Sequence, residues 1–295
     1  KPLTIRNIAL LALAIAGIAL SVIIGLFQPD KNLPPTAAPL FELMGKPLKT
    51  ADRALTRVLP ISDLDERELG EAIALRYASY REEGVPEQKY LDELVQALTR
   101  NNEKGFEYRV FILPSSVPNA AAAPGGILFV TSGLLTMVET ESELVSILGH
   151  EIGHVELSHC MDMVRFQLLA QKIDSRPLGE IADIAVGIML RPSFSKTQEA
   201  DADRYGFGVL IREAYNPFGM ANAFDKLAAL DPSSMDRANP LYEYFMSHPY
   251  SKLRADRYRA EARQAELESY YVGKLNLEEK LSRFSQEYEK EWVRR

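Results

Sequence analysis

Residues 150–154 read His150-Glu151-Ile152-Gly153-His154. On an α-helix, positions four apart lie on nearly the same face, so both imidazoles can point at one metal ion. Glu151 stands one position round the helix and can reach a water molecule at that ion. Upstream, Thr140 and Glu143 have the spacing of a capping box ahead of an apolar stripe. The sequence therefore predicts a helix that begins near Thr140 and carries a metal site.

Two imidazoles leave a tetrahedral zinc ion short of one protein ligand, besides the open position that catalysis needs. Glu199 and Asp203 lie one helical turn apart in the segment from Phe194 to Gly206. Glu199 can supply the third ligand, while Asp203 can orient a ligand imidazole by accepting its hydrogen bond. Acidic residues at this spacing usually form a solvated face, so the assignment depends on the HExxH pattern upstream. We predict one zinc ion per chain, bound by His150, His154 and Glu199.

An apolar run near the N-terminus, Ile8 to Phe27, contains 20 residues and no charge. At 1.5 Å per residue it spans about 30 Å, the hydrocarbon thickness of a bilayer. We predict an uncleaved anchor that contacts the lipid bilayer through residues 8–27. A cleaved signal peptide and a buried core helix are the alternatives. Lys1 and Arg6 favour a cytoplasmic N-terminus, which places the remaining chain on the periplasmic or exterior side of an inner membrane, or in the equivalent organellar arrangement.

Composition excludes several classes of protein. The 295 residues are 46% hydrophobic and 25% charged, which is ordinary for a globular protein and excludes disorder, collagen and a disulfide scaffold. With 34 basic and 41 acidic residues the net charge is -7, so we predict no nucleic-acid partner. Cys160 is the single cysteine, which excludes an internal disulfide and a cysteine-based zinc site.

Hydrophobic periodicity predicts the other elements. Amphipathic helices are expected at residues 63–83 and 87–99, and strands at 106–113 and 127–131. The apolar segment 178–190 is too short to cross a bilayer and is predicted as a packed helix. We divide the chain into a transmembrane anchor at 1–28, a proline-rich linker at 29–50, a catalytic domain at 51–262 and a charged helical extension at 263–295.

The sequence resembles the gluzincin metallopeptidases, which include the CAAX prenyl protease, the HtpX membrane protease and the Oma-type and periplasmic chaperone-proteases. The resemblance covers about residues 60–260. Besides the HExxH helix and the segment from Ser195 to Gly206, it is carried by Asp65-Glu66-Arg67-Glu68-Leu69-Gly70, Asn119 with Pro124-Gly125-Gly126, Tyr215-Asn216-Pro217, and His248-Pro249 with Arg254. It implies an α+β fold, a mostly helical zincin-like domain with a small sheet beside the HExxH helix. Because the chain has a single predicted span, it is most similar to the singly anchored or periplasmic chaperone-protease branch of this family.

The resemblance also implies the roles of site residues. His150, His154 and Glu199 are then the zinc ligands, and Glu151 is the general base. The segment that carries Asn119 and residues 127–131 is the sheet edge that receives substrate.

Two further residues of the resemblance lie downstream. His248 and Arg254 are candidates to donate hydrogen bonds to the negative charge of the transition state. His248 has two alternative roles: a fourth ligand that blocks the metal at rest, or an ordinary capping residue.

His159 follows His150 by nine residues. On an ideal helix this is a rotation of about 180°, so we predict that His159 faces away from the metal and has a structural role.

Three functional hypotheses follow. The first is a membrane-anchored zinc endopeptidase that hydrolyses misfolded or unassembled envelope and membrane proteins, since strand capture at a sheet edge favours extended polypeptide substrates. The second is a chaperone-like assembly factor that binds unfolded chains with little proteolysis. The third is a structural anchor whose metal only stabilises the fold, and Glu151 argues against it because a structural site needs no base.

Overall fold

The computed structural model describes residues 63–82, 84–162, 164–165, 182, 185, 194–230 and 251–294. Leu59–Arg295 forms one compact unit. In the described ranges no helix combines the length and apolar character needed to cross a bilayer. The predicted span at residues 8–27, the linker, His248 and all of the predicted helix at 178–190 except residues 182 and 185 lie outside the described residues.

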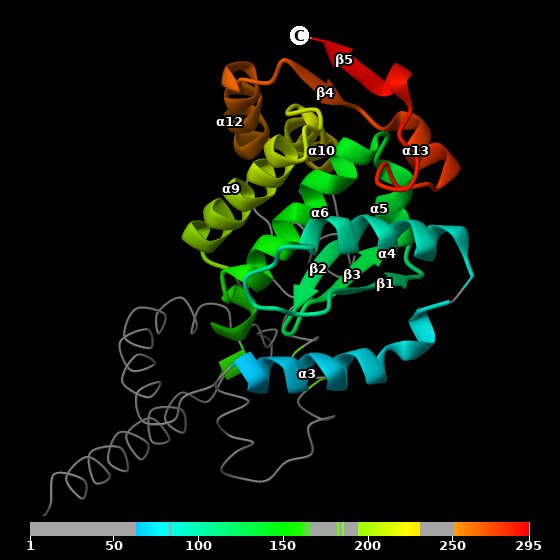
Figure 1. Cartoon of the computed structure of the whole chain (residues 1–295). Helices are drawn as coiled ribbons and strands as arrows, with labels where there is room; N and C mark the ends of the chain where they lie inside the picture. The colour runs from blue at the N-terminus through cyan, green and yellow to red at the C-terminus, as the bar shows by residue number, and fades with distance from the viewer. Residues whose placement is uncertain are drawn as a thin grey trace, which may run out of the picture. The chain divides into compact units, whose positions relative to one another are not determined.

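The described elements are mostly helices around a small sheet (Figure 1), which confirms the predicted α+β class. In chain order they are α3 (Asp63–Arg76), η1 (Ala78–Tyr80), α4 (Pro86–Thr99), β1 (Arg109–Leu113), β2 (Ala120–Ala123), β3 (Ile127–Thr131), α5 (Ser132–Met137), α6 (Glu141–Glu156), α9 (Lys196–Arg212), α10 (Gly219–Ala229), α12 (Ser251–Gln264), β4 (Ser269–Tyr271), α13 (Lys274–Glu279), η3 (Glu289–Glu291) and β5 (Trp292–Arg294).

The main sheet has the strand order β1-β3-β2. β1 runs parallel to β3, with Phe111 opposite Phe129, and β2 runs antiparallel to β3, with Ala121 opposite the same phenylalanine. The prediction that residues 127–131 form the edge is wrong, because β3 is paired on both sides. The edge beside α6 is β2, whose four alanines have neither the alternation nor the β propensity that would predict a strand.

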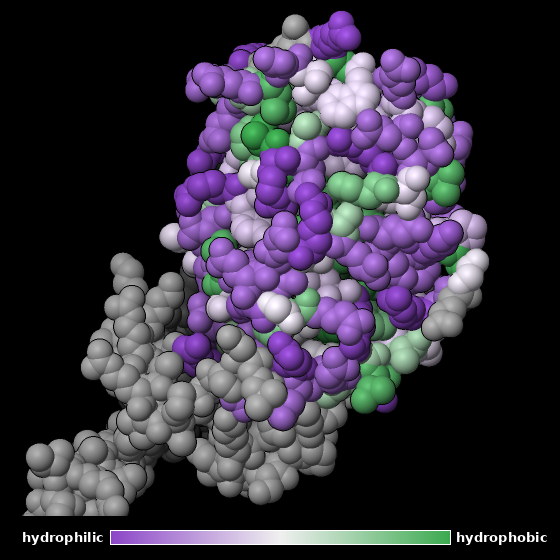
Figure 2. Space-filling view, viewed as in Figure 1, coloured by the Kyte–Doolittle hydropathy of each residue, from purple (hydrophilic) through white to green (hydrophobic). Residues whose placement is uncertain are grey.

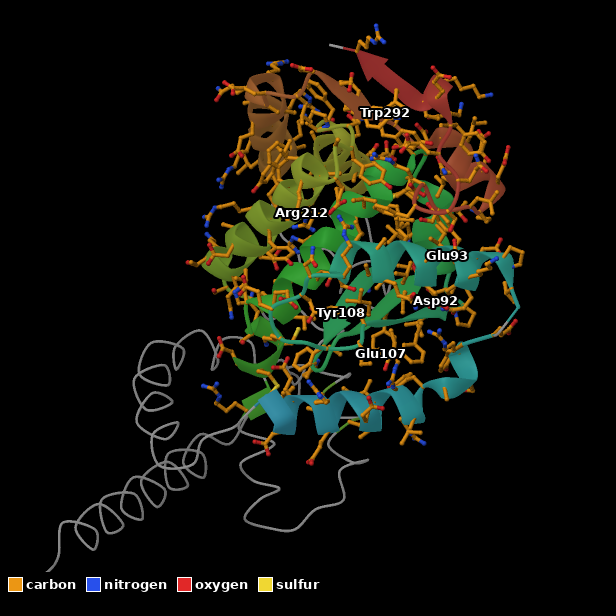
Figure 3. All side chains as sticks on the ribbon, viewed as in Figure 1. Asp92, Glu93, Glu107, Tyr108, Arg212 and Trp292 are labelled. Atoms are coloured by element: carbon orange, nitrogen blue, oxygen red, sulfur yellow. The ribbon has the colours of Figure 1, made fainter. Side chains whose placement is uncertain are left out.

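Helices α4 and α6 pack against the sheet, and α9 and α10 pack on α6. In Figure 1, α4 crosses one face of the sheet. The end of α9 is fastened to α4 by Arg212, which donates to the Leu98 carbonyl at 3.4 Å and lies between the two helices in Figure 3. Arg100 adds an ion pair with Glu213 at 2.9 Å. These contacts fix the direction in which α9 crosses α6.

Helix α3 is held against the turn between β2 and β3. Glu66 is buried, pairs with Lys104 at 2.8 Å and accepts a hydrogen bond from the Gly125 nitrogen at 3.4 Å. A Cβ atom at Gly70 would stand 2.8 Å from the Gly125 Cα, so the helix and the turn touch through their backbones. This contact joins two of the motifs of the sequence analysis. Glu66 and Gly70 belong to the motif at residues 65–70, and Gly125 belongs to the motif at residues 124–126.

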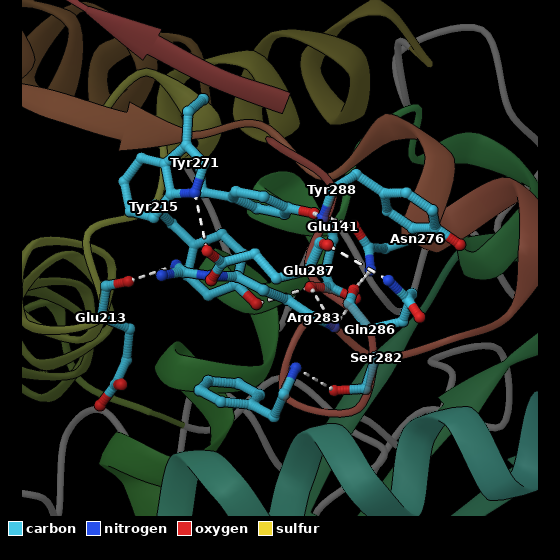
Figure 4. Close-up of polar contacts among 12 residues, drawn as sticks. Glu141, Glu213, Tyr215, Tyr271, Asn276, Ser282, Arg283, Gln286, Glu287 and Tyr288 are labelled. Atoms are coloured by element: carbon cyan, nitrogen blue, oxygen red, sulfur yellow. Dashed lines mark hydrogen bonds and ion pairs between the residues drawn. The ribbon is translucent and has the colours of Figure 1, made fainter. Parts of the chain in front are cut away.

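The C-terminal residues differ from the predicted helical extension. They form the strand pair β4–β5 and the six-residue helix α13, and they fold over the N-terminal end of α6. Arg283 stacks on the rings of Tyr215 and Tyr271 (Figure 4), with its guanidinium carbon 5.0 and 4.7 Å from their centroids. The same carbon lies 4.7 Å from the centroid of the Trp292 ring. The charge pattern predicted a solvated helix, but these aromatic rings instead attach the segment to the domain.

Hydrophilic residues cover most of the described surface seen in Figure 2. Among the described residues, the two most exposed large apolar side chains are Leu75 on α3 and Leu253 on α12.

Candidate metal centre

The ring nitrogens of two histidines and a carboxylate meet between α6 and α9. His150 Nε2 lies 3.1 Å from His154 Nε2, and the Glu199 oxygens lie 3.7 Å and 3.4 Å from these two nitrogens. All three side chains are buried. The structure thus brings together the three residues predicted as ligands, and we call them the metal centre.

These distances fit a tetrahedral metal ion. Bonds of about 2.0–2.2 Å to nitrogen and oxygen, at tetrahedral angles, place ligand atoms about 3.4 Å apart. Two neutral imidazoles and one carboxylate are also the donor set of many catalytic zinc sites, which keep a further position open. The residues present therefore fit a divalent metal ion in both spacing and chemistry.

N-terminal caps fix where α6 and α9, the two helices of the metal centre, begin. The Thr140 hydroxyl accepts from the Glu143 nitrogen at 3.2 Å, as predicted for the start of α6. Helix α9 begins with a capping box that was not predicted: Ser195 accepts from the Gln198 nitrogen, and the Gln198 side chain accepts from the Ser195 nitrogen. Glu199 therefore lies in the first turn of α9.

The close approach of α6 and α9 depends on glycine. A Cβ atom at Gly206 would stand 2.8 Å from the His150 nitrogen, and one at Gly153 would stand 2.9 Å from the Tyr205 Cβ. Because no side chain separates the backbones at these two positions, the carboxylates of α9 reach the imidazoles of α6.

Nδ1 of His150, the ring nitrogen that points away from the metal centre, has a carboxylate partner. His150 Nδ1 lies 2.9 Å from Asp203 Oδ1, the contact predicted for Asp203. Arg254 donates from Nε to Asp203 Oδ2 at 2.8 Å. Burial would raise the pKa of Asp203, but the positive charge of Arg254 and the hydrogen bond from His150 outweigh it and lower that pKa. Asp203 therefore stays ionised and accepts a hydrogen bond from His150 Nδ1.

The outer nitrogen of His154 meets a second imidazole, because His154 Nδ1 and His159 Nδ1 are 3.1 Å apart. The prediction that His159 faces away from this site is therefore wrong. It assumed one continuous helix, whereas α6 ends at Glu156 and Ser158 adopts the left-handed region with φ 61. Burial lowers the pKa of His159, which favours the neutral ring.

Sequence reasoning also missed Phe194. Its ring stacks on His154, with centroids 3.8 Å apart and planes inclined by 19°. Its position directly before the Ser195 cap indicates an apolar residue that packs near the start of α9, but this position does not show that the ring meets His154.

The remaining predicted site residues are placed as follows. Glu151 is buried on α6 next to His150. Arg254 lies on α12 with its guanidinium against Asp203 and with Nη1 3.2 Å from Glu199 Oε2. Asn119 is half-buried, and its backbone is bonded to Thr131 through both N–H and C=O. These two backbone groups of Asn119 therefore face β3.

Comparison with known proteins gives consistent matches. Residues 86–262 match the profile described as Peptidase family M48. The chain is 30% identical over 182 residues to the metalloprotease LoiP of Escherichia coli (strain K12), covering 58% of this chain and 69% of that protein. It is 25% identical over 175 residues to the mitochondrial metalloendopeptidase OMA1 of Arabidopsis thaliana, covering 58% and 35%. It is 31% identical over 196 residues to the beta-barrel assembly-enhancing protease of Yersinia pestis, covering 60% and 39%. The chain spans less than half the length of the last two relatives.

Proposed function

We propose that this chain, which belongs to peptidase family M48 and is a metalloendopeptidase, depends on zinc. We also propose that it cleaves extended segments of unfolded polypeptides. The geometry of the metal centre supports zinc as the metal. Two imidazole nitrogens and one carboxylate converge at spacings of 3.1, 3.4 and 3.7 Å, which match the tetrahedral coordination of zinc.

A zinc ion held by these ligands supplies a Lewis acid that lowers the pKa of water and polarises a carbonyl. Glu151 is placed beside His150 on α6 to take a proton from the attacking water. The same carboxyl group then passes this proton to the amine that leaves when the peptide bond breaks. Burial of Glu151 keeps bulk water from competing for the proton.

The β2 edge supports an extended substrate. Because Asn119 and Thr131 form a hydrogen-bonded pair, the alternation of an antiparallel ladder turns the N–H and C=O groups of Ala120 and Ala122 away from β3. These alanines are buried in the structure, so an extended peptide that pairs with them alongside α6 requires this edge to be uncovered first. Alanine adds no large side chain there, so backbone hydrogen bonds carry the recognition and little sequence preference is expected.

We further propose that the substrates are misfolded or unassembled envelope proteins and that the enzyme is anchored in the inner membrane, with its catalytic domain on the periplasmic or exterior side. Support for the anchor comes from the charge-free run at residues 8–27. Support for the substrate class comes from the β2 edge and from the relative named as a beta-barrel assembly-enhancing protease.

The test of the proposed function is Glu151→Gln, with casein as an unfolded substrate and zinc content measured on the same samples. This change removes the base and leaves the three ligands in place. We expect casein cleavage to fall by about 10²- to 10⁴-fold. The zinc content should stay near one ion per chain.

Glu156→Gln is the matched control, because Glu156 is the last residue of the same helix and bonds to Tyr108 instead of the metal centre. It should retain both cleavage and zinc. Full cleavage by the zinc-free wild-type protein would contradict the proposal. Unchanged casein cleavage by Glu151→Gln would remove Glu151 from the mechanism, and binding of casein without cleavage by the wild type would favour the chaperone-like alternative.

A further inference from the structure

We propose that His159 is a positioning residue for zinc binding: its Nδ1 accepts a hydrogen bond from His154 Nδ1 and so holds this ligand ring in place. The inference rests on the proposed zinc-dependent function. It assigns to His159 a role that its place in the sequence did not predict.

The two rings are close and enclosed. Their Nδ1 atoms are 3.1 Å apart, and the ring planes are inclined by 66° with centroids 5.1 Å apart. His154 is 0% exposed and His159 is 6% exposed. A hydrogen bond between two buried rings is not exchanged with bulk water, so it can fix the orientation of His154.

The direction of this hydrogen bond follows from the metal centre. His154 Nε2 faces His150 Nε2 and Glu199, so Nε2 is the nitrogen that supplies the metal ligand. A neutral imidazole that binds a metal through Nε2 carries its proton on Nδ1. His154 Nδ1 therefore donates, and His159 Nδ1 accepts with its own proton on Nε2.

The backbone places His159 for this task. Helix α6 ends at Glu156, and the left-handed Ser158 turns the chain back towards α6. The Asp162 nitrogen then donates to the Ser158 carbonyl at 3.0 Å, so the helix that contains His159 starts anew from this turn. An unbroken helix would carry residue 159 away from His154, since five positions correspond to a rotation of about 140°.

The two ligand imidazoles thus have different outer partners. His150 meets the carboxylate of Asp203, whereas His154 meets a neutral ring and is covered on one face by Phe194. Outer partners of this kind raise the basicity of the ligand and fix its tautomer, and their loss typically costs about 10- to 100-fold in metal affinity.

The test compares His159→Leu with His159→Asn. Leucine fills the space without an acceptor, whereas the asparagine Oδ1 stands where Nδ1 stood and can accept the same hydrogen bond from His154 Nδ1. For wild type and both variants, we would measure the zinc dissociation constant by competition with a chromophoric chelator. We would also record the absorption spectrum of the cobalt(II)-loaded protein and the melting temperature of the metal-free protein for each variant.

We expect His159→Leu to bind zinc about 10- to 100-fold more weakly and to alter the cobalt spectrum. His159→Asn should stay within about threefold of wild type, because it restores the acceptor. Cys160→Ala is the matched control: this neighbouring residue is also buried, and its substitution should leave zinc affinity unchanged.

Wild-type affinity in the leucine variant would overturn the inference. Equal weakening in the leucine and asparagine variants would also overturn it, because the acceptor would then not matter. If His159→Leu did not fold, the smaller His159→Ala would take its place in the same comparison. Absence of zinc binding by the wild type would instead contradict the proposed function, so the two failures are distinguishable.

Discussion

Arg254 contacts two carboxylates that serve the metal centre in different ways. It donates to Asp203, the outer partner of His150, and its Nη1 lies 3.2 Å from the ligand Glu199. Its guanidinium carbon also lies 4.2 Å from the centroid of the Phe224 ring. The sequence made Arg254 a candidate donor to the negative charge of the transition state, but this geometry supports a residue that holds the two carboxylates in place.

Arg254→Lys separates these roles, because lysine keeps the charge and loses the fork that contacts both carboxylates. We expect zinc affinity to fall by about 10-fold, measured by chelator competition. Arg257→Lys, on the exposed side of the same helix, should leave zinc affinity unchanged. A lower kcat with unchanged zinc affinity would instead support the transition-state role.

At the scale of elements, the metal centre depends on how closely α6 and α9 approach. His150 and His154 come from α6, while Glu199 and Asp203 come from the first half of α9. Ligand atoms must converge within tenths of an ångström for tetrahedral binding, so a small displacement of α9 would separate the carboxylates from the imidazoles. Gly206 lies at the point of closest contact.

Gly206→Ala should therefore weaken zinc binding and destabilise the fold. The new Cβ would stand 2.8 Å from the His150 backbone nitrogen, which cannot move without shifting α6. We expect a loss of about 1–3 kcal/mol in the free energy of unfolding, measured with urea, together with weaker zinc binding.

Gly208→Ala is the matched control on the same helix, because among the described residues nothing beyond its own stretch of helix lies within 4 Å of the added Cβ. Alanine favours a helix interior over glycine by about 1 kcal/mol, so this variant should be as stable as wild type or more stable. Equal behaviour of the two variants would show that close packing at Gly206 does not matter.

The C-terminal segment completes α6, the helix that carries two of the proposed metal ligands. The first N–H groups of α6 need acceptors from outside the helix. The Glu141 and Ser142 nitrogens donate to the carbonyls of Gly273 and Val272 at 3.0 and 3.2 Å. Gly273 has φ 77, and a Cβ there would stand 2.6 Å from the Glu141 Cβ. The C-terminal segment is therefore a structural part of the catalytic unit.

Glu141 makes this contact sensitive to pH. It is fully buried and accepts hydrogen bonds from the Tyr215 hydroxyl at 2.6 Å and the Arg283 nitrogen at 3.1 Å (Figure 4). Burial raises the pKa of Glu141 to about 7, and the hydrogen bonds from Tyr215 and Arg283 offset only part of that effect. The folded state therefore holds this proton more tightly than the unfolded chain, in which the pKa is near 4.5.

A raised carboxyl pKa stabilises the fold at low pH, and this stability is lost as pH rises from about 4.5 through about 7. Glutamine cannot ionise, so Glu141→Gln should be free of this loss. We expect the difference in unfolding free energy between variant and wild type to grow by about 3 kcal/mol across that window. Urea unfolding at a series of pH values, with a chelator present throughout, measures it.

The exposed Glu278→Gln on α13 is the control and should follow the wild-type pH dependence. A difference between Glu141→Gln and wild type that stays constant with pH would show that Glu141 does not titrate in this range.

The sequence determined the features that depend on neighbouring residues. The spacing of His150 and His154, the cap at Thr140 and the i, i+4 pair of Glu199 and Asp203 are local patterns, because a helical turn fixes which side chains share a face. These patterns predicted the ligand set, whereas the mostly helical class with a small sheet was implied by the resemblance to the gluzincin metallopeptidases.

Three other features are visible only in the folded structure. The edge position of β2, the C-terminal cover of α6, and the meeting of His159 with His154 depend on contacts between distant segments or on one left-handed residue. Alanine has little strand preference, and a charged segment attaches through aromatic rings whose partners lie elsewhere in the chain. Periodicity describes one element at a time, so it cannot show where the chain leaves a helix or what the next element packs against.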